Sequence, residues 1–287
     1  MELDHPPERE FSRVRRPGVP GPRASTQARD AAERSIDHFQ KARYTPKGRS
    51  PGSGEDFFGS AEDGDIGKNM VFSPDLRLEA RGLAIRRGFR LLFEGLDLDL
   101  ASGEIVQLSG PNGAGKSTLM RILGGFSRAD MGTIRWQGVP EDVETGSLFH
   151  YHGHREALRE ALTPRENLAF SAGLLGGHED AIVPALEQLG AGMLADLPVQ
   201  VLSAGQRRRV ALARLLVAPR PLWLLDEPLA ALDVEGQALV GRLIADHQAQ
   251  GGMALVATHQ SLGIAVRHLV LDGRGKVSGQ AAAGILT

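Results

Sequence analysis

Cysteine is absent from the 287-residue sequence. This absence excludes a disulfide framework and any cysteine-ligated metal centre, and it suits a reducing compartment. No run of 18 apolar residues occurs, so the sequence predicts no membrane-spanning helix. The net charge is only −2, which argues against a protein that binds nucleic acid through bulk electrostatics. With 41% hydrophobic residues, the chain can still bury a sizeable core.

Residues 1–69 differ in composition from the rest of the chain. They contain few large aliphatic side chains, many charges of both signs and seven of the sixteen prolines. Such a segment cannot bury enough apolar surface to offset its ordering entropy, so we expect disorder, with at most a weak helix over 25–43. No apolar stretch resembles a signal peptide. Two interpretations stay open: translation starts at Met70, or the extension binds a partner.

A glycine-rich stretch follows a short apolar strand that we expect over 104–109. It reads Gly110-Pro-Asn-Gly-Ala-Gly-Lys-Ser-Thr118 and fits the pattern G-x-x-x-x-G-K-[ST]. Glycines let successive N–H groups form an anion-binding nest, and the helix expected over Ser117–Leu123 adds its N-terminal dipole. Lys116 would reach the β- and γ-phosphates of a nucleotide and is a candidate catalytic residue, and the Ser117 hydroxyl would bind Mg²⁺. The sequence therefore predicts a nucleotide-phosphate site.

Two further apolar stretches end in polar side chains. Residues 221–225 lead into Asp226 and Glu227, and residues 252–257 lead toward His259. Buried strands with such ends place these groups at the carboxyl edge of a parallel sheet, where ligands bind. We expect Asp226 to hold Mg²⁺, mostly through water, and Glu227 to orient or deprotonate the attacking water. We expect His259 to hydrogen-bond the γ-phosphate.

The chain ahead of the glycine-rich stretch alternates between apolar and polar residues. The alternation covers residues 76–80 and 96–100, on either side of Ile85–Phe93, and it predicts an antiparallel β-subdomain. Arg87 and Phe89 are candidates to contact an adenine ring, by cation–π interaction or stacking. For Phe89, a place in the core explains the residue equally well.

The stretch Leu202-Ser-Ala-Gly-Gln206 precedes an arginine-rich helical pattern. Ser203 and Gln206 have the spacing of a capping box, which predicts that a helix starts here. A helix N-terminus that carries Ser203 and Gly205 is a second anion site. Two separate anion sites in one chain suggest that ATP lies between two copies of it.

Together these motifs resemble those of the nucleotide-binding subunits of ABC transporters. The resemblance rests on the order phosphate loop, LSAGQ, LLDEP, AALD and THQ, and it covers about residues 75–275. It implies an α/β P-loop NTPase of the ABC type within residues 70–287. The implied parts are a parallel core sheet, an antiparallel β-subdomain and a helical signature insert over about 156–206.

The same resemblance implies how the nucleotide is bound. Two copies would form a homodimer that closes head to tail around two MgATP, and the AALD turn would cross the interface. Ser203 and Gly205 would act on the ATP of the other copy. The residues implied to contact nucleotide are Gly110, Pro111, Asn112, Gly113, Ala114, Gly115, Lys116, Ser117, Thr118, Ser203, Gly205, Gln206 and Asp233.

One position departs from the family pattern and narrows the resemblance. Alignment to Leu162–Leu168 puts Arg155 where the family usually has a glutamine that meets the metal. A Gly-His-Arg turn, LTPRENL, LSAGQRRRVALARL, LWLLDEP and THQ together are similar to the cytochrome c maturation ATPases, the CcmA or haem exporter type. This resemblance implies coupling of ATP hydrolysis to a CcmB-like membrane partner at the cytoplasmic face of the bacterial inner membrane. The partner-facing loop would be His154–Arg159.

Two other functions and one other site stay open. An ABC ATPase for a different exported cargo would carry the same motifs, because the membrane subunit selects the cargo. A soluble ABC protein of DNA repair or translation would need a long insert or a second ATPase domain, and the motif spacing leaves room for neither. His150, His152 and His154 could share one strand face and ligate iron or zinc. A strand that leads into the partner-facing loop explains them as well.

Overall fold

The computed structural model describes residues 71–273 and 277–280. The predictions made for residues 1–69 lie outside this part of the chain. Within it, no helix combines the length and the apolarity needed to cross a bilayer. The strands are β1 (Arg77–Arg87), β2 (Arg90–Ala101), β3 (Ile105–Ser109), β4 (Met131–Gln137), β5 (Phe149–His152), β6 (Leu222–Asp226), β7 (Met253–Ala257), β8 (Arg267–Leu271) and β9 (Val277–Gln280). The α-helices are α2 (Lys116–Leu123), α3 (Pro164–Leu175), α4 (Ile182–Gln188), α5 (Ala204–Val217) and α6 (Val234–Ala249).

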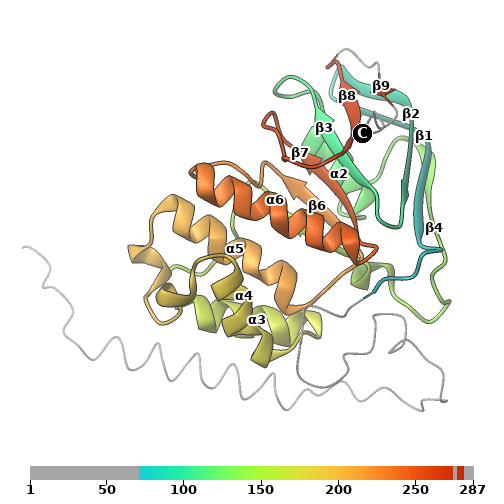
Figure 1. Ribbon diagram of the computed structural model, residues 1–287. Coiled ribbons are helices and arrows are strands. Elements are labelled where there is room, and N and C mark those ends of the chain that lie inside the picture. The colour runs from blue at the N-terminus through green and yellow to red at the C-terminus, as the bar shows by residue number, and fades with distance from the viewer. Residues whose placement is uncertain (1–70, 274–276, 281–287) are drawn as a thin grey trace, which may run out of the picture. The chain divides into compact units, whose positions relative to one another are not determined.

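The main sheet has the strand order β5-β6-β7-β3-β8-β9 (Figure 1). Its first five strands run parallel, and β9 pairs antiparallel with β8. Because the strands are parallel, the carboxyl ends of β3, β6 and β7 meet at one edge of the sheet. The phosphate loop follows β3, Asp226 is the last residue of β6, and the turn with His259 follows β7, so the predicted placement of the motifs at one edge is confirmed.

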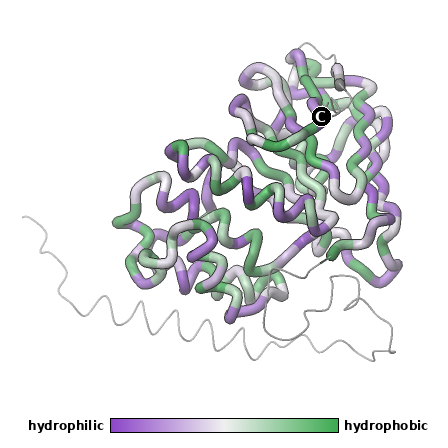
Figure 2. Tube along the Cα trace, in the orientation of Figure 1, coloured by the Kyte–Doolittle hydropathy of each residue, from purple (hydrophilic) through white to green (hydrophobic). Residues whose placement is uncertain are grey.

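The central strands are buried on both faces, as their continuous apolar sequences predict. All five residues of β6 are buried, and so are all five of β7. Successive side chains alternate between two cores: Leu222 and Leu224 join the cluster with α2, whereas Trp223 and Leu225 join the cluster with the other helices. These strands are mostly green in Figure 2, whereas the helices mix both colours. Full burial of one such side chain stabilises the fold by roughly 1.5–3 kcal/mol.

A second sheet, with the order β2-β1-β4, is antiparallel, as the alternating sequence predicted. The two expected strands pair directly with each other, with Leu78 opposite Leu100 and Ile85 opposite Phe93. They therefore form one long hairpin rather than two short strands that flank a separate segment. Its turn lies at Gly88, whose φ of +59° is in the left-handed region that favours glycine.

The helices α3, α4 and α5 form a group on one side of α6, whose other side faces the sheet (Figure 1). Short 3₁₀ turns lie between them: Glu179–Ala181, Gly192–Leu194 and Val199–Val201. Buried residues of all three helices share one core with β6 and β7. The α3 helix begins with a capping box of Thr163 and Glu166, and Pro164 occupies a first-turn position where its missing N–H costs nothing.

Candidate functional site

The phosphate loop joins β3 to α2, and its glycines are required by the backbone. Gly110 has φ +139° and Gly115 has φ +107°, both in the left-handed region. A Cβ on Gly110 would lie 2.1 Å from the carbonyl oxygen of Leu271, so no other residue fits there without moving the backbone. Gly115 is the N-cap of α2 and leaves that helix end without a side-chain cap. The first N–H groups of a helix have no intrahelical partner, so they are available to an anion.

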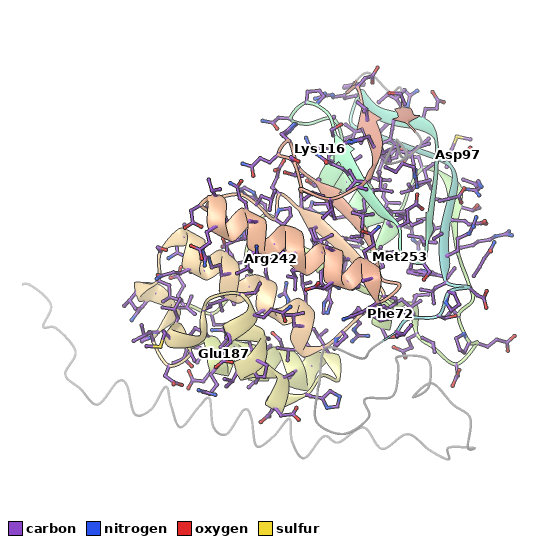
Figure 3. All side chains as sticks on the ribbon, viewed as in Figure 1. Phe72, Asp97, Lys116, Glu187, Arg242 and Met253 are labelled. Atoms are coloured by element: carbon purple, nitrogen blue, oxygen red, sulfur yellow. The ribbon has the colours of Figure 1, made fainter. Side chains whose placement is uncertain are left out.

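Lys116 is the first residue of α2 (Figure 3). It is only 8% exposed. Its Nζ lies 2.6 Å from the carbonyl oxygen of Gly110 and 3.3 Å from that of Pro111. In the described part of the chain, no carboxylate forms an ion pair with this ammonium group. A nearly buried cation without a counter-ion favours an anion in the loop. The loop therefore fits the phosphates of ATP.

Two acidic residues end β6 at the same edge of the sheet. Asp226 is 6% exposed and pairs in register with Ala257 of β7. Glu227 follows with a strained left-handed backbone, φ +51°, and its N–H donates to the carbonyl of Ala257 at 2.8 Å. This kink separates the directions of two adjacent side chains, so one carboxylate is buried and the other is partly exposed.

His259 lies between the loop lysine and the second carboxylate. Its Nε2 is 3.4 Å from Lys116 Nζ and 3.9 Å from Glu227 Oε1. The three residues predicted to be catalytic are therefore brought together from α2, the end of β6 and the end of β7. The sequence reasoning missed Gln107, a buried residue of β3. Its Nε2 donates to the carbonyls of Thr258 and Gln260, on both sides of His259, at 3.3 and 3.2 Å.

Mg²⁺ prefers oxygen ligands and usually keeps waters and substrate phosphates in its shell. The Ser117 hydroxyl in the first turn of α2 and the Asp226 carboxylate are oxygen donors of this kind. No described group of three His, Cys, Asp or Glu residues could hold a metal by itself. The residues present thus fit a magnesium ion that arrives with a nucleotide.

The signature stretch lies at the start of α5. The predicted capping box is confirmed: Ser203 Oγ accepts from Gln206 N–H, and Gln206 Oε1 accepts from Ser203 N–H. Gly205 is approached by the carbonyl oxygen of Ala231, which would be 2.9 Å from an added Cβ. Asp233 caps α6 through Gly236 and also accepts from Arg209 of α5 at 2.8 Å.

These contacts join the signature helix to the turn before α6. Among the described residues, no hydrogen bond or ion pair joins the signature stretch 203–206 to the phosphate loop 110–118. Within one copy of the chain, the described signature residues therefore make no direct polar contact with the phosphate loop.

The metal hypothesis for the three histidines is wrong. The strand β5 ends at His152, so exposed His154 does not continue the shared face. His150 donates from Nε2 to the carbonyl of Ala218 at 2.5 Å, and His152 accepts from Arg208 at 2.9 Å. Burial lowers the pKa of both buried imidazoles to about 3, so they are neutral members of the core.

The hairpin between β1 and β2 presents Phe89 to solvent. This ring is fully exposed, which excludes the alternative that it belongs to the core. The neighbouring Arg90 was missed in the sequence, because nothing distinguished it from other surface arginines. Its Nη2 donates to the carbonyl of Gly273 at 3.4 Å, and its Nη1 would lie 3.3 Å from a Cβ on Gly113. The hairpin end is therefore close to the phosphate loop.

The segment after β5 contains the predicted partner-facing loop. Arg155 is exposed, and Ala157 has a strained backbone with φ +55°. The main chain of Arg159 is fixed to α3, because its N–H donates to Asn167 Oδ1 at 2.8 Å and its carbonyl accepts from Asn167 Nδ2 at 3.1 Å. The guanidinium of Arg159 lies 4.6 Å from the ring centroid of Phe170.

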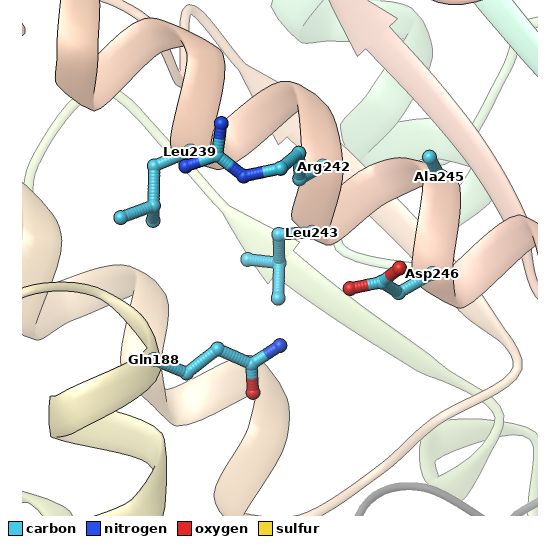
Figure 4. Close-up of a pocket in the computed structure, with 6 residues that line it drawn as sticks. All are labelled: Gln188, Leu239, Arg242, Leu243, Ala245 and Asp246. Carbon is cyan, nitrogen blue, oxygen red and sulfur yellow. The ribbon is translucent and has the colours of Figure 1, made fainter.

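A small pocket of about 190 Å³ lies away from this site, between α4 and α6 (Figure 4). Figure 4 shows Gln188 on α4 facing the side chains of α6. The lining residues are Gln188, Leu239, Arg242, Leu243, Ala245 and Asp246. None of the residues predicted to bind ATP or Mg²⁺ lines this pocket.

Comparison with known proteins gives the family. The sequence profile of the ABC transporter family matches residues 93–230. The cytochrome c biogenesis ATP-binding export protein CcmA of Rhodopseudomonas palustris (strain HaA2) is 47% identical over 194 residues, covering 68% of this chain and 97% of that protein. CcmA of Nitrobacter winogradskyi is 47% identical over 198 residues, covering 69% of this chain and 99% of that protein.

Solved structures show the same fold. A putative ABC transporter ATP-binding protein from Pyrococcus furiosus has a TM-score of 0.61 at 22% identity and covers 70% of this chain and 100% of its own. An inward-facing, putative metal-chelate type ABC transporter also has a TM-score of 0.61, at 26% identity, and covers 74% of this chain and 86% of its own. The α/β fold with one parallel and one antiparallel sheet, predicted from the motifs, is thus confirmed. The chain belongs to the CcmA family of ABC transporter ATP-binding proteins.

Proposed function

We propose that this chain binds and hydrolyses ATP to drive a membrane partner in c-type cytochrome biogenesis, by haem export or by release of haem to a chaperone. One observation carries the proposal: about 47% identity to CcmA proteins over almost their whole length. The geometry supports it, because Lys116, Glu227 and His259 lie together beside a phosphate loop. As an enzyme, the chain would belong to the ABC-type ATP hydrolases that transport haem.

Each site residue has a role that its surroundings support. Lys116 and the N–H groups of residues 110–118 would bind the phosphates, and Ser117 and Asp226 would bind Mg²⁺. Glu227 would act as general base toward a water molecule, and His259 would hydrogen-bond the terminal phosphate. When bound, MgATP supplies the phosphoanhydride bond whose hydrolysis releases the free energy used by the complex.

The signature residues support a homodimer within the complex. Ser203 and Gly205 belong to the start of α5, and Asp233 to the start of α6, and among the described residues none of them makes a polar contact with the chain's own phosphate loop. If two copies associate head to tail, the anion site at the N-terminus of α5 in one copy would face the phosphate loop of the other copy. Ser203, Gly205 and Gln206 would then contact the nucleotide held by the other copy.

The partner would be an integral membrane protein of the CcmB type. The loop His154–Arg159 is suited to contact it, because Arg155 is exposed and the loop is fixed to α3 at its end. The chain would then lie peripherally at the cytoplasmic face of the bacterial inner membrane. Arg155 would provide a cation where other family members have glutamine.

Deletion of the gene tests the proposal. We expect covalently haem-bound c-type cytochromes to disappear while b-type haem proteins remain, as detected by haem staining of membrane proteins after denaturing electrophoresis. The intact gene should restore the c-type bands, and a copy with Lys116→Ala should not. Normal c-type bands in the deletion strain would contradict the proposal and favour another exported cargo.

A further inference from the structure

Arg208 occupies an unusual position in the signature helix. It lies five residues after Ser203, yet the residue is only 3% exposed, unlike the partly exposed Arg207 and Arg209 beside it. Its guanidinium contacts two segments that are distant in sequence, the end of β5 and the turn after β6. Nη1 donates to His152 Nε2 at 2.9 Å, Nη2 to the carbonyl of Glu227 at 3.3 Å, and Nε to the carbonyl of Ala230 at 3.5 Å.

No carboxylate neutralises this buried cation by direct contact, as far as the described residues show. Burial lowers the pKa of Arg208, and the charges of Glu156, Asp226 and Glu227 oppose that effect from a distance. An apolar side chain of similar size would avoid the cost of desolvating a guanidinium. The three hydrogen bonds are therefore what this arginine provides that an apolar residue could not.

Two of the three acceptors flank strained backbone. Among described non-glycine residues, positive φ angles occur only at Ala157, Glu227 and Ala231. The carbonyl of Glu227 itself accepts from Arg208, and Ala230 directly precedes Ala231. A left-handed backbone at a non-glycine residue costs free energy and persists only where the surroundings fix it. Arg208 is placed to fix this turn.

His152 provides the third acceptor for the guanidinium. It is fully buried at the end of β5, and because Nε2 accepts from Arg208, the ring proton resides on Nδ1. Nδ1 has no hydrogen-bond partner among the described residues, so the ring's polar contact is with Arg208. The loop His154–Arg159, with its strained Ala157, begins two residues later.

We propose that Arg208 is a positioning residue that fixes Glu227 and the turn Ala230–Asp233 for hydrolysis, and that His152 makes this position depend on the loop His154–Arg159. The inference rests on the proposed function, in which Glu227 acts as base. Movement of the loop on binding a membrane partner would shift His152, then the guanidinium, then the Glu227 backbone. The contact thus links the partner-facing loop to the hydrolytic carboxylate through one side chain.

Kinetics of the full-length protein test the Arg208 part. Arg208→Met keeps the side-chain length but removes the charge and the donors, and Arg208→Lys keeps the charge but loses the planar fork. We expect kcat to fall on the order of 10²-fold in Arg208→Met, since small misplacements of a catalytic group cost rate on this scale. The kcat of Arg208→Lys should lie between those of wild type and Arg208→Met. The affinity of both variants for a fluorescent ATP analogue should stay within about threefold of wild type. Exposed Arg242→Met on α6 is the matched control.

A double variant separates positioning from a general structural defect. Once Glu227→Gln has removed the base, Arg208→Met should lower the residual rate little further, because both substitutions remove the same contribution, the action of a correctly placed Glu227. The inference would be overturned if the rate losses of Glu227→Gln and Arg208→Met multiplied in the double variant. It would also be overturned if Arg208→Met lowered ATP affinity as much as kcat. An unchanged kcat in Arg208→Met would overturn it as well. If wild-type protein itself fails to hydrolyse ATP, the proposed function fails rather than this inference.

The His152 part has its own variants, which keep the test decisive if Arg208→Met does not fold. His152→Gln retains an acceptor for the guanidinium, whereas His152→Leu fills similar space without one. We expect His152→Leu to lower kcat. The largest fall, on the order of tenfold, should occur in the partner-stimulated hydrolysis measured in membranes. The affinity for ATP should stay unchanged. His152→Gln should recover most of the rate. Equal rates in the two variants would overturn the proposed link.

Discussion

The Nζ of Lys116 lies 3.4 Å from the Nε2 of His259, although 143 positions separate the two residues in sequence. Lysine nitrogen can only donate, so the imidazole accepts on Nε2 and carries its proton on Nδ1. Glu227 Oε1 lies 3.9 Å from the same imidazole nitrogen. The phosphate-loop cation and the candidate general base thus both lie close to one imidazole nitrogen.

Lys116→Ala should abolish ATP hydrolysis. The phosphates would lose the one nearly buried cation of the loop, and removal of a preorganised charge of this kind costs on the order of 10²-fold or more in rate. Phosphate release and binding of a fluorescent ATP analogue measure the effect. Arg121→Ala, an exposed change on the same helix, should have little effect. Near-wild-type turnover by Lys116→Ala would refute the assignment of the phosphate site.

Glu227→Gln should separate binding from chemistry. The amide keeps the size of the side chain but loses its basicity, so hydrolysis should slow by about 10²–10⁴-fold while ATP still binds. The variant should then accumulate as an ATP-bound dimer, which light scattering with and without MgATP detects. Exposed Glu94→Gln is the matched control. An unchanged hydrolysis rate would exclude Glu227 as the base.

Gln107→Met should lower turnover without weakening nucleotide binding. Methionine fills similar space in β3 but cannot donate to the carbonyls of Thr258 and Gln260, so the turn with His259 loses its support. A 1 Å displacement of a catalytic group can cost about 10²-fold in rate. The same substitution at exposed Gln137 serves as control. Equal kcat values in the two variants would show that Gln107 does not position His259.

The parts of the fold that follow from strong local patterns were predictable. The phosphate loop, the buried strands that lead to Asp226 and Ala257, and the capping box at Ser203 each carry their own signal. Periodicity and cap spacing are local features, so they can be recognised in the sequence without knowledge of tertiary contacts. The two sheets, and the carboxyl edge that the motifs share, could therefore be predicted from the sequence.

The supporting contacts of the site were not predictable in the same way. Gln107 gave a weak signal as a polar residue inside an apolar strand, and its hydrogen bonds are to residues about 150 positions away. Arg208 gave none, because three consecutive arginines in a helix look alike and only the direction of each side chain differs. The metal alternative for the histidines fails because β5 ends at His152, just before the Gly-His-Arg turn, so His154 does not share the face of His150 and His152.

Three buried histidines should make the stability of the fold fall at mildly acidic pH. His247 stacks on Trp223 at 3.8 Å, and its Nε2 donates to the carbonyl of Met253 at 3.2 Å. Burial lowers its pKa from 6.5 to about 3, as it does for His150 and His152. Because these folded-state values lie below the unfolded value, the unfolded chain binds more protons between pH 6.5 and about 3. The stabilisation is complete above pH 6.5 and is lost as the pH falls.

Urea denaturation between pH 7 and pH 5 measures this effect. Well below the unfolded pKa, each histidine should lower the free energy of unfolding by about 1.4 kcal/mol for each pH unit. His150→Gln keeps a donor for the carbonyl of Ala218 but cannot titrate, so it should remove about a third of the pH-dependent loss, one of three equal contributions. His268→Gln is the matched control, because that side chain is exposed and its substitution should leave the pH dependence unchanged. If His150→Gln shows the full wild-type loss, then His150 is protonated in the folded protein and its hydrogen bond to Ala218 does not depend on a neutral ring.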